Sequence, residues 1–336
     1  MSQQESISNS SSTPISRLSR HLKPVPSRPL PASTSHEFYW VDPADRPALE
    51  ALGFSHASAW LDHPPGRLLR TVQGRENWYI KFPAALGTKG AYLKRHREMQ
   101  PIWMQLLLSS LEKILLWTGW NEPSQTPPKF SRGLNYAPSQ TTFTTTAGRM
   151  EAENILRLQS HDIPTMRLIC CGERFLPGGS ESFVMTEELT GYQQLDHYLR
   201  QHFPPVADAR PNDLAKLRRL IEAVAVVARQ FHLAGFNHRD FYACHFFIKI
   251  MPDQTYDVRL IDLQRVQARQ RFRRRWLVKD LAQLAYSTPK EQVGCKQRLQ
   301  FFKSYLGVRK LNTEARQLLR QILSKQSWMQ WRQGSY

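Results

Sequence analysis

The segment from His238 to Gln267 constrains this chain more than any other. Two aspartates frame it: Asp240 directly follows a His-Arg pair, and Asp262 stands in the apolar run Leu-Ile-Asp-Leu. A carboxylate inside a buried strand is unfavourable by several kcal/mol unless a cation or hydrogen bonds compensate it. We therefore interpret Asp262 as the ligand of a metal ion.

Between the two aspartates the sequence predicts a short β-hairpin. Residues 246–250 and 256–261 have strand composition, and Pro252 and Asp253 mark the turn. A hairpin brings its two ends together, so Asp240 and Asp262 are expected to face one cleft. One carboxylate would accept a proton while the other held a cation, as in phosphoryl transfer of the kinase type.

The residues before this segment strengthen the interpretation. Residues 214–233 have apolar side chains at helical spacing, and Gly235 follows as a helix-ending glycine would. The catalytic segment of a kinase has this same order: a helix, a glycine, His-Arg-Asp, a hairpin and a buried aspartate. The alternative is a surface loop with an ion pair and an unrelated carboxylate.

The motif Asn-His-Arg-Asp-Phe-Tyr-Ala-Cys-His-Phe, followed by Leu-Ile-Asp-Leu-Gln-Arg-Val-Gln, resembles the Kdo/heptose kinase family of the bacterial lipopolysaccharide core. The likeness covers roughly residues 66–82 and 147–285. It implies an α+β, two-lobed protein-kinase-like fold with a small antiparallel β lobe and a mostly helical C-lobe. It also implies an ATP- and Mg²⁺-dependent kinase whose acceptor is a heptose or Kdo hydroxyl of the lipid-linked inner core.

The resemblance also implies roles for individual residues. Asp240 would be the catalytic base. The nucleotide would be bound by Lys81, by Glu151 paired with it (Glu153 competes for this place), and by Gly66, Met185 and Glu187. Asp262 and His245 would face the metal, and His238, Arg239 and Asp280 would support the loop, with Asp280 opening a helix beneath it.

Two departures from the usual kinase pattern leave questions open. His245 stands where protein kinases have asparagine, although Mg²⁺ prefers oxygen ligands. It is either a second metal ligand or a hydrogen-bonding brace for Asp262. Asp262-Leu263-Gln264 replaces Asp-Phe-Gly, which makes a mobile activation switch doubtful.

The expected organisation is a disordered basic tail (residues 1–36), an N-lobe (37–188) interrupted by an insertion (84–146), and a C-lobe (189–336) containing the catalytic segment 236–267. The N-lobe is predicted to begin with three strands, over residues 55–61, 68–73 and 78–82. Gly66 would lie in the first turn, over the nucleotide phosphates. Two basic helices are expected over residues 292–329.

The charge balance predicts an anionic partner. The 336-residue chain has a formal net charge of +18. The basic run 89–97 precedes an amphipathic pattern with tryptophans over residues 102–117, which predicts peripheral binding to an anionic membrane surface. The alternative is a helix packed on its own domain. A second basic run, residues 265–275, stands where kinases place the segment that meets the acceptor, so it is expected to bind phosphate or Kdo carboxylate groups; the alternative is a solvated or disordered loop.

The remaining composition indicates a cytoplasmic protein, and the family resemblance implies that it works on the cytoplasmic face of the inner membrane, where the acceptor lipid would lie. The four cysteines have neither zinc nor disulfide spacing, and no signal core or membrane span is evident. Three alternatives stay open: a small-molecule phosphotransferase, a protein kinase, and an inactive kinase-like binding module. A nucleic-acid partner is not expected, because the basic runs are scattered. The sugar, the hydroxyl and the oligomeric state are not determined.

Overall fold

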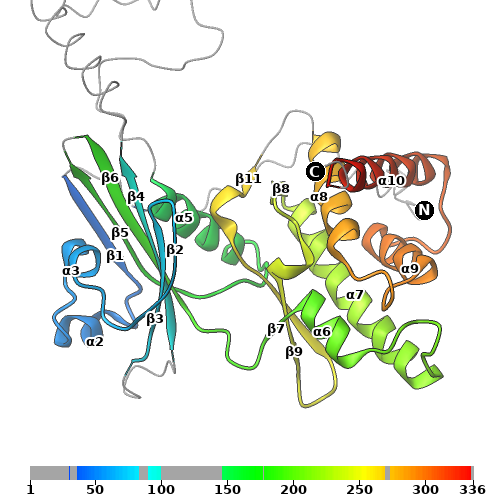
Figure 1. Ribbon diagram of the computed structural model, residues 1–336, viewed down its shortest axis with the longest axis horizontal. Coiled ribbons are helices and arrows are strands. Elements are labelled where there is room, and N and C mark those ends of the chain that lie inside the picture. Colours follow the sequence, from blue (N-terminus) through cyan, green and yellow to red (C-terminus); the bar gives the residue numbers. More distant parts are fainter. Residues whose placement is uncertain are drawn as a thin grey trace, which may run out of the picture. The chain divides into compact units, whose positions relative to one another are not determined.

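The computed structural model describes residues 30, 36–82, 90–99, 146–176, 178–268 and 273–333 (Figure 1). Apart from residues 30 and 36, the tail lies outside these ranges, and so does the helix expected over residues 102–117. The chain divides into two compact units. The N-terminal unit comprises Ala32–Met150 and Ile169–Met185, and the C-terminal unit is built mainly from Glu151–Leu168 and Thr186–Tyr336. One boundary therefore falls between Met185 and Thr186, close to residue 188, where the N-lobe was predicted to end.

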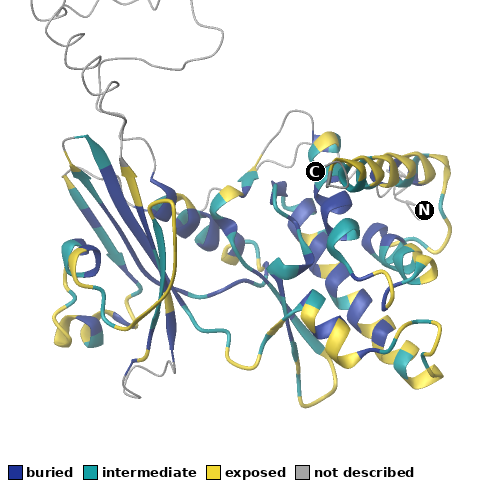
Figure 2. Cartoon of the chain, viewed as in Figure 1, coloured by how far each residue is buried: buried dark blue, intermediate teal, exposed yellow. Residues whose placement is uncertain are grey.

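The N-terminal unit is a six-stranded sheet with the order β1-β5-β6-β4-β3-β2. Two short helices, α2 (Arg46–Ala51) and α3 (Ala57–Asp62), contribute to its core, in which Trp60, Leu93 and Phe183 are fully buried (Figure 2). The strands are β1 (Glu37–Val41), β2 (Arg67–Val72), β3 (Arg75–Ile80), β4 (Ala91–Met99), β5 (Leu168–Leu176) and β6 (Gly179–Glu187).

The prediction of a strand over residues 55–61 is wrong, because this segment forms α3. Its buried residues Ala57, Trp60 and Leu61 have the i, i+3, i+4 spacing of a helix. Gly66 (φ 111°) consequently lies before β2 and not in a turn between two strands. The first hairpin of the sheet joins β2 to β3, and Gln73 and Gly74 form its turn with positive φ.

The insertion predicted over residues 84–146 has the wrong start. Residues 91–99 form β4, which lies between β3 and β6 in the sheet. Its basic residues Arg95 and His96 are buried, and the Arg95 Nε donates to Glu76 Oε2 at 3.0 Å. This part of the basic run is therefore structural and does not form a free membrane-facing surface.

The C-terminal unit is mainly helical. The predicted helix is α7 (Pro211–Leu233), which begins three residues earlier than expected, with Pro211 in its first turn. Gly235 follows with a φ of 94°, as a helix-ending glycine would. Helix α5 (Ala147–Gln159) and helix α6 (Leu195–His202), which was not predicted, precede α7 in the chain.

The predicted hairpin is confirmed as β9 (Phe246–Ile250) and β10 (Tyr256–Leu260), to which β7 (Gln193–Gln194) adds a third strand. The short strands β8 (Phe236–Asn237) and β11 (Gln267–Ala268) pair at the two ends of the catalytic segment. The two predicted C-terminal helices are confirmed as α9 (Cys295–Leu306) and α10 (Thr313–Gln333).

Helix α8 (Arg273–Ser287) corrects one expectation. Asp280 does not open this helix, because α8 begins seven residues earlier and Asp280 lies about two turns inside it. Among the described helices, none is both long and apolar enough to cross a bilayer.

Candidate active site

The catalytic loop, residues 238–245, lies between β8 and β9 and is held by side chains of α8. Asp280 is fully buried. Its carboxylate accepts hydrogen bonds from the backbone N–H groups of His238, at 2.8 Å, and Arg239, at 3.0 Å. A buried carboxylate that accepts charge-assisted bonds from backbone donors holds a loop firmly.

The next two turns of α8 continue this support. Gln283 Oε1 accepts from the Phe241 N–H at 3.2 Å, and Ser287 Oγ accepts from the Ala243 N–H at 2.8 Å. Residues 280, 283 and 287 share one helix face, so α8 binds the loop backbone at four positions.

Arg239 has a left-handed backbone conformation, with φ 71°. Its carbonyl oxygen accepts hydrogen bonds from Lys279 Nζ, at 2.8 Å, and Gln283 Nε2, at 2.9 Å. A non-glycine residue in this region costs on the order of 1–3 kcal/mol, so these contacts determine a conformation that the residue would not adopt alone. The conformation sets the direction of the side chain of the next residue, Asp240.

Two buried histidines complete the support. His238 Nε2 donates to the Ile261 carbonyl at 3.0 Å, and burial lowers the pKa of His238, so its ring is neutral at pH 7. His232 Nε2 lies 3.4 Å from Asp280 Oδ2, and its Nδ1 lies 2.9 Å from the Tyr305 hydroxyl. Sequence reasoning missed His232 and Tyr305, which stand in the apolar faces of α7 and α9 without a motif.

Asp262 lies outside the strand in which it was predicted. The pairing of β10 ends at Leu260, and Asp262 has a left-handed backbone (φ 58°) at the start of the 3₁₀ turn Leu263–Arg265. Its side chain is 31% exposed, so it is not buried in an apolar strand. Asn154 of α5 fixes the following turn by donating to the carbonyls of Leu263 and Val266 at 2.8 and 3.1 Å. The buried Asn154 was also missed.

His245 contacts both ends of the site. Its Nδ1 donates to the Asp240 carbonyl at 2.7 Å, and its Nε2 lies 3.6 Å from Asp262 Oδ2. Burial alone would lower the pKa of His245, but hydrogen bonds with Cys244 and the Asp240 carbonyl, together with the charge of Asp262, raise that pKa to about 9. The hairpin therefore links the two aspartates through one imidazole.

The Asp240 carboxylate forms an ion pair with Arg265. The Arg265 Nη1 donates to both carboxylate oxygens, at 2.9 and 2.8 Å. The side chain of Arg265 is half exposed and that of Asp240 is 21% exposed. The pair orients the carboxylate and places a positive charge beside it.

The donor set fits a magnesium ion held with the help of a nucleotide. Mg²⁺ is commonly bound by one or two carboxylates together with phosphate oxygens and water. Asp262 supplies one such carboxylate. Within the described ranges, no group of three or more His, Cys, Asp and Glu side chains could hold a metal by itself.

The expected nucleotide-binding residues are divided between the two units. In the N-terminal unit, Lys81 is exposed just beyond β3, whereas Met185 is fully buried in β6. In the C-terminal unit, Glu151 is fully buried, and the Glu187 Oε2 accepts from the Arg167 Nε at 2.7 Å. One further candidate, Lys94, lies half-buried on β4.

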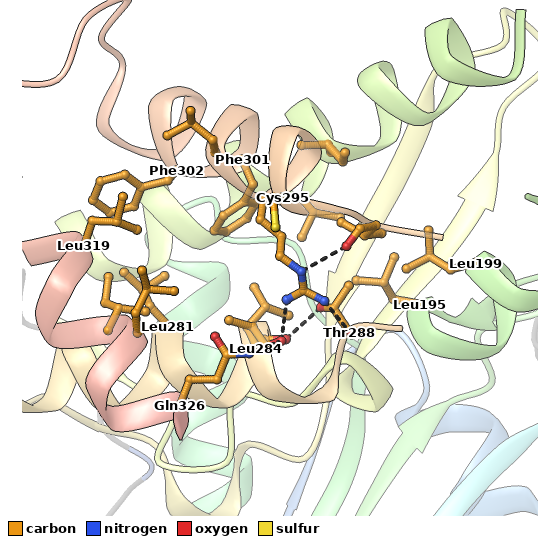
Figure 3. Close-up of a pocket in the computed structure, with 18 of the residues that line it drawn as sticks. Leu195, Leu199, Leu281, Leu284, Thr288, Cys295, Phe301, Phe302, Leu319 and Gln326 are labelled. Atoms are coloured by element: carbon orange, nitrogen blue, oxygen red, sulfur yellow. Dashed lines mark hydrogen bonds between the residues drawn. The ribbon is translucent and has the colours of Figure 1, made fainter. Parts of the chain in front are cut away.

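The C-terminal unit also contains an apolar pocket of about 240 Å³ (Figure 3). Helices α6 to α10 line it with side chains that include Leu199, Leu284 and Phe302. The Arg298 guanidinium reaches in from α9 and donates to the backbone carbonyls of Val293, Thr288 and Ala285. The pocket is therefore lined mainly by apolar side chains, and the one cation among its described lining residues, Arg298, is hydrogen-bonded to backbone carbonyls of the protein itself.

The sheet, the helical unit and the His-Arg-Asp loop followed by Asp262 define the protein-kinase-like class of folds. A solved structure described as WaaP in complex with acyl carrier protein matches this fold with a TM-score of 0.57 and 24% identity, covering 88% of this chain and 97% of that chain. The model of the lipopolysaccharide kinase (Kdo/WaaP) family matches residues 134–305. The chain belongs to this family.

Two curated relatives are both described as lipopolysaccharide core heptose(I) kinase WaaP. The protein from Pseudomonas aeruginosa is 34% identical over 186 residues, which cover 54% of this chain and 66% of the relative. The protein from Escherichia coli strain K12 is 36% identical over 160 residues, which cover 46% and 58%. The chain thus matches less than two thirds of the length of each.

Proposed function

We propose that this chain transfers the γ-phosphoryl group of ATP to a heptose or Kdo hydroxyl of the lipopolysaccharide inner core. The observation that carries the proposal is the contact of His245 with the backbone carbonyl of Asp240 and with the Asp262 carboxylate, which brings the two residues to one imidazole. A base and a metal-binding carboxylate must act on one phosphoryl group. Membership of the lipopolysaccharide kinase family supports the acceptor.

In this proposal Asp240 accepts the proton of the acceptor hydroxyl, and the α8 contacts keep its loop in place. Asp262 would hold Mg²⁺, which would neutralise charge on the nucleotide phosphates. His245 either braces Asp262 or takes part in metal binding. Arg265 keeps the Asp240 carboxylate oriented.

Two variants separate the roles of the aspartates. Asp240→Ala is expected to lower turnover on an inner-core acceptor by roughly 10²–10⁴ while leaving Mg·ATP affinity unchanged. Asp262→Asn is expected to abolish the Mg²⁺-dependent part of ATP binding, because an amide replaces a carboxylate poorly on a hard cation. Calorimetry with Mg·ATP and a single-turnover assay measure the two effects. Near-normal turnover in Asp240→Ala would remove the proposed base.

The nucleotide lysine has two candidates. In kinase-type lobes the lysine stands on the strand that follows the glycine-containing hairpin. Here the β2–β3 hairpin contains Gly74, and the next strand, β4, carries Lys94 inside the sheet. We infer that Lys94 binds the α- and β-phosphates, with the exposed Lys81 as the alternative.

Two matched variants, Lys94→Gln and Lys81→Gln, distinguish the two candidate lysines. The correct lysine, changed to glutamine, should weaken ATP binding about tenfold or more, since a charge-assisted hydrogen bond contributes about 1.5–3 kcal/mol. The other substitution should have little effect. If Lys81→Gln weakens ATP binding and Lys94→Gln does not, Lys81 is the nucleotide-binding lysine, as the family resemblance implies.

The solved relative in complex with acyl carrier protein suggests a partner. We propose that the apolar pocket takes an acyl chain presented by such a carrier. Leu323 lines the pocket and is half exposed, so Leu323→Glu changes its lining at low risk to the core. This variant should lose co-purification with acylated carrier. Equal capture of acylated and unacylated carrier by wild type would reject the proposal.

We also propose that the protein works at the cytoplasmic face of the inner membrane, since its proposed acceptor is lipid-linked. The net charge of +18 supports contact with anionic lipid. Flotation with anionic and neutral vesicles, at low and high salt, tests this location. Equal binding to both kinds of vesicle would contradict it.

A further inference from the structure

A second concave surface, which we call the basic groove, lies between α8 and α10, two helices that pack side by side (Figure 1). Its volume is about 680 Å³. The mechanism proposed above does not use it. The cations that line it are Arg239, Arg274, Arg275, Lys279 and Lys325.

The groove concentrates positive charge. Among the described residues that line it there is no carboxylate. Burial lowers the pKa of Lys325, and the charges of Arg275 and Arg332 lower it further. Like charges at this density repel one another, and of the five cations Lys279 lies near the charges of Asp280 and Asp240.

Two guanidinium groups at the groove have spare hydrogen-bonding capacity. Within the described part of the chain, Arg274 Nη2 and Arg239 Nε are buried without a hydrogen-bond acceptor. The Arg274 Nε does have one, Gln321 Oε1 at 2.9 Å. Buried donors without acceptors are costly, so neither guanidinium is fully satisfied by contacts within the protein.

The position of the arginines at the start of α8 also favours an anionic ligand. The helix begins with three arginines and has no acidic residue in its first turn. The N-terminus of a helix is the positive end of its dipole, where anions are favoured and cations are not. The groove therefore combines side-chain charge with backbone polarity of the same sign.

Two tryptophans hold the cations without neutralising them. Trp276 lies within 5.7–5.9 Å of the charged groups of Arg239, Arg275 and Lys279, measured to the ring centroid. Trp328 lies 3.6 Å from Lys325 Nζ. Cation–π contacts of this kind fix the direction of a cation while its charge stays available.

The groove is linked to the catalytic loop by covalent structure. Arg239 lines the groove, and the next residue is Asp240. Successive Cα atoms are about 3.8 Å apart. The Arg239 backbone is held by Asp280, Lys279 and Gln283, so the position of its side chain is tied to that of the base.

We propose that the basic groove binds phosphate or carboxylate groups carried by the sugar acceptor and so places the acceptor hydroxyl beside Asp240. The inference rests on the proposed function and names the feature of the acceptor that is recognised. Free nucleic acid and anionic lipid without sugar are excluded by the proposal.

The test compares two double variants of the full chain. Arg275→Gln with Lys325→Gln removes two groove cations that make cation–π contacts. Arg309→Gln with Lys310→Gln makes the same charge change at exposed positions between α9 and α10, outside the groove lining. The probe is lipid A bearing Kdo and heptose in nonionic detergent micelles, without ATP. Its counterpart is the same glycolipid with its phosphates removed and its carboxyl groups reduced.

Wild type and the control variant should bind the anionic glycolipid at least tenfold more tightly than the neutral one, and the groove variant should lose this preference. Equal affinities for the two glycolipids in wild type, or an unchanged preference in the groove variant, would overturn the proposal. The proposal would also be overturned if phosphatidylglycerol micelles or a single-stranded oligonucleotide bound as tightly as the anionic glycolipid and lost this binding in the groove variant.

Kinetics separate this proposal from the proposed function. If wild type phosphorylates the glycolipid, the groove variant should show a KM raised tenfold or more with kcat changed less. An unchanged KM would reject the groove and leave the function intact. Groove-dependent binding without ATP-dependent phosphorylation would reject the function and leave the groove intact.

Discussion

The two halves of α8 differ in how their polar side chains are satisfied. In the C-terminal half, Asp280, Gln283 and Ser287 accept backbone N–H groups of the catalytic loop. In the N-terminal half, Arg274 and Arg275 face a groove with no lining carboxylate in the described part of the chain. One half is arranged for stability, and the other retains charge that folding alone does not need.

Two physical criteria distinguish residues that stabilise the fold from residues that bind a ligand: whether their polar groups are hydrogen-bonded, and whether like charges are clustered. A buried polar group that is fully hydrogen-bonded stabilises one conformation. Clustered like charges and buried donors without acceptors oppose folding, and we propose that the groove retains them because they bind a ligand. Substitutions in the C-terminal half should therefore lower stability, whereas removal of groove cations should leave it unchanged or raise it.

The largest effect is expected from Asp280→Ala. The change leaves the N–H groups of His238 and Arg239 buried without an acceptor, and each costs about 1–3 kcal/mol. The free energy of unfolding should fall by about 3–5 kcal/mol, measured by urea denaturation, with loss of activity. Asp208→Ala, at an exposed position, is the control and should change stability by less than about 0.5 kcal/mol. A loss as small as that of the control would mean that α8 does not hold the loop.

Ser287→Ala should have an intermediate effect. It removes the acceptor of the Ala243 N–H, so stability should fall by about 1–2 kcal/mol. Hydrogen exchange at the Ala243 amide should quicken. Ser304→Ala, a half-buried position near the end of α9, is the matched control. Unchanged exchange at Ala243 in the Ser287 variant would contradict the assignment.

The smallest effect, with no loss of stability, is expected from Arg275→Gln with Lys325→Gln. Because this change relieves repulsion, the stability of the ligand-free protein should stay within about 0.5 kcal/mol of wild type or rise. Added salt should stabilise wild type more than the variant, since screening weakens repulsion over about 10 Å at 0.1 M. Thermal melting at two salt concentrations measures this. A clear drop in melting temperature would show that the groove cations are structural, and the contrast between the two halves of α8 would fail.

The parts of the fold that follow from local sequence were predicted well. The apolar period of α7, the glycine after it and the turn of the β9–β10 hairpin are all local signals. The helix α3 was mistaken for a strand although its buried residues have helical spacing. Strand β4 was missed because it is charged, and the burial of Arg95 depends on Glu76, a residue on the neighbouring strand.

In the candidate site, too, only the residues marked by a local motif could be predicted from the sequence. Asp240, His245 and Asp262 were found by motif, and the hairpin explains why His245 contacts the other two. The left-handed conformation of Asp262 could not be read from its apolar neighbours, because the strand ends where its partner strand ends. Contacts between distant segments, such as those of Asn154 and His232, carry no signal in a single sequence.

The ion pair between Arg265 and Asp240 has a consequence for the fidelity of an enzyme with the proposed function. While the guanidinium contacts both carboxylate oxygens, it competes with a water molecule for the lone pairs of the base. An acceptor hydroxyl must compete with Arg265 for the carboxylate, and an acceptor that also has anionic groups can draw the guanidinium away. Consumption of ATP would then be coupled to the presence of the correct sugar, and wasteful hydrolysis would stay low in its absence.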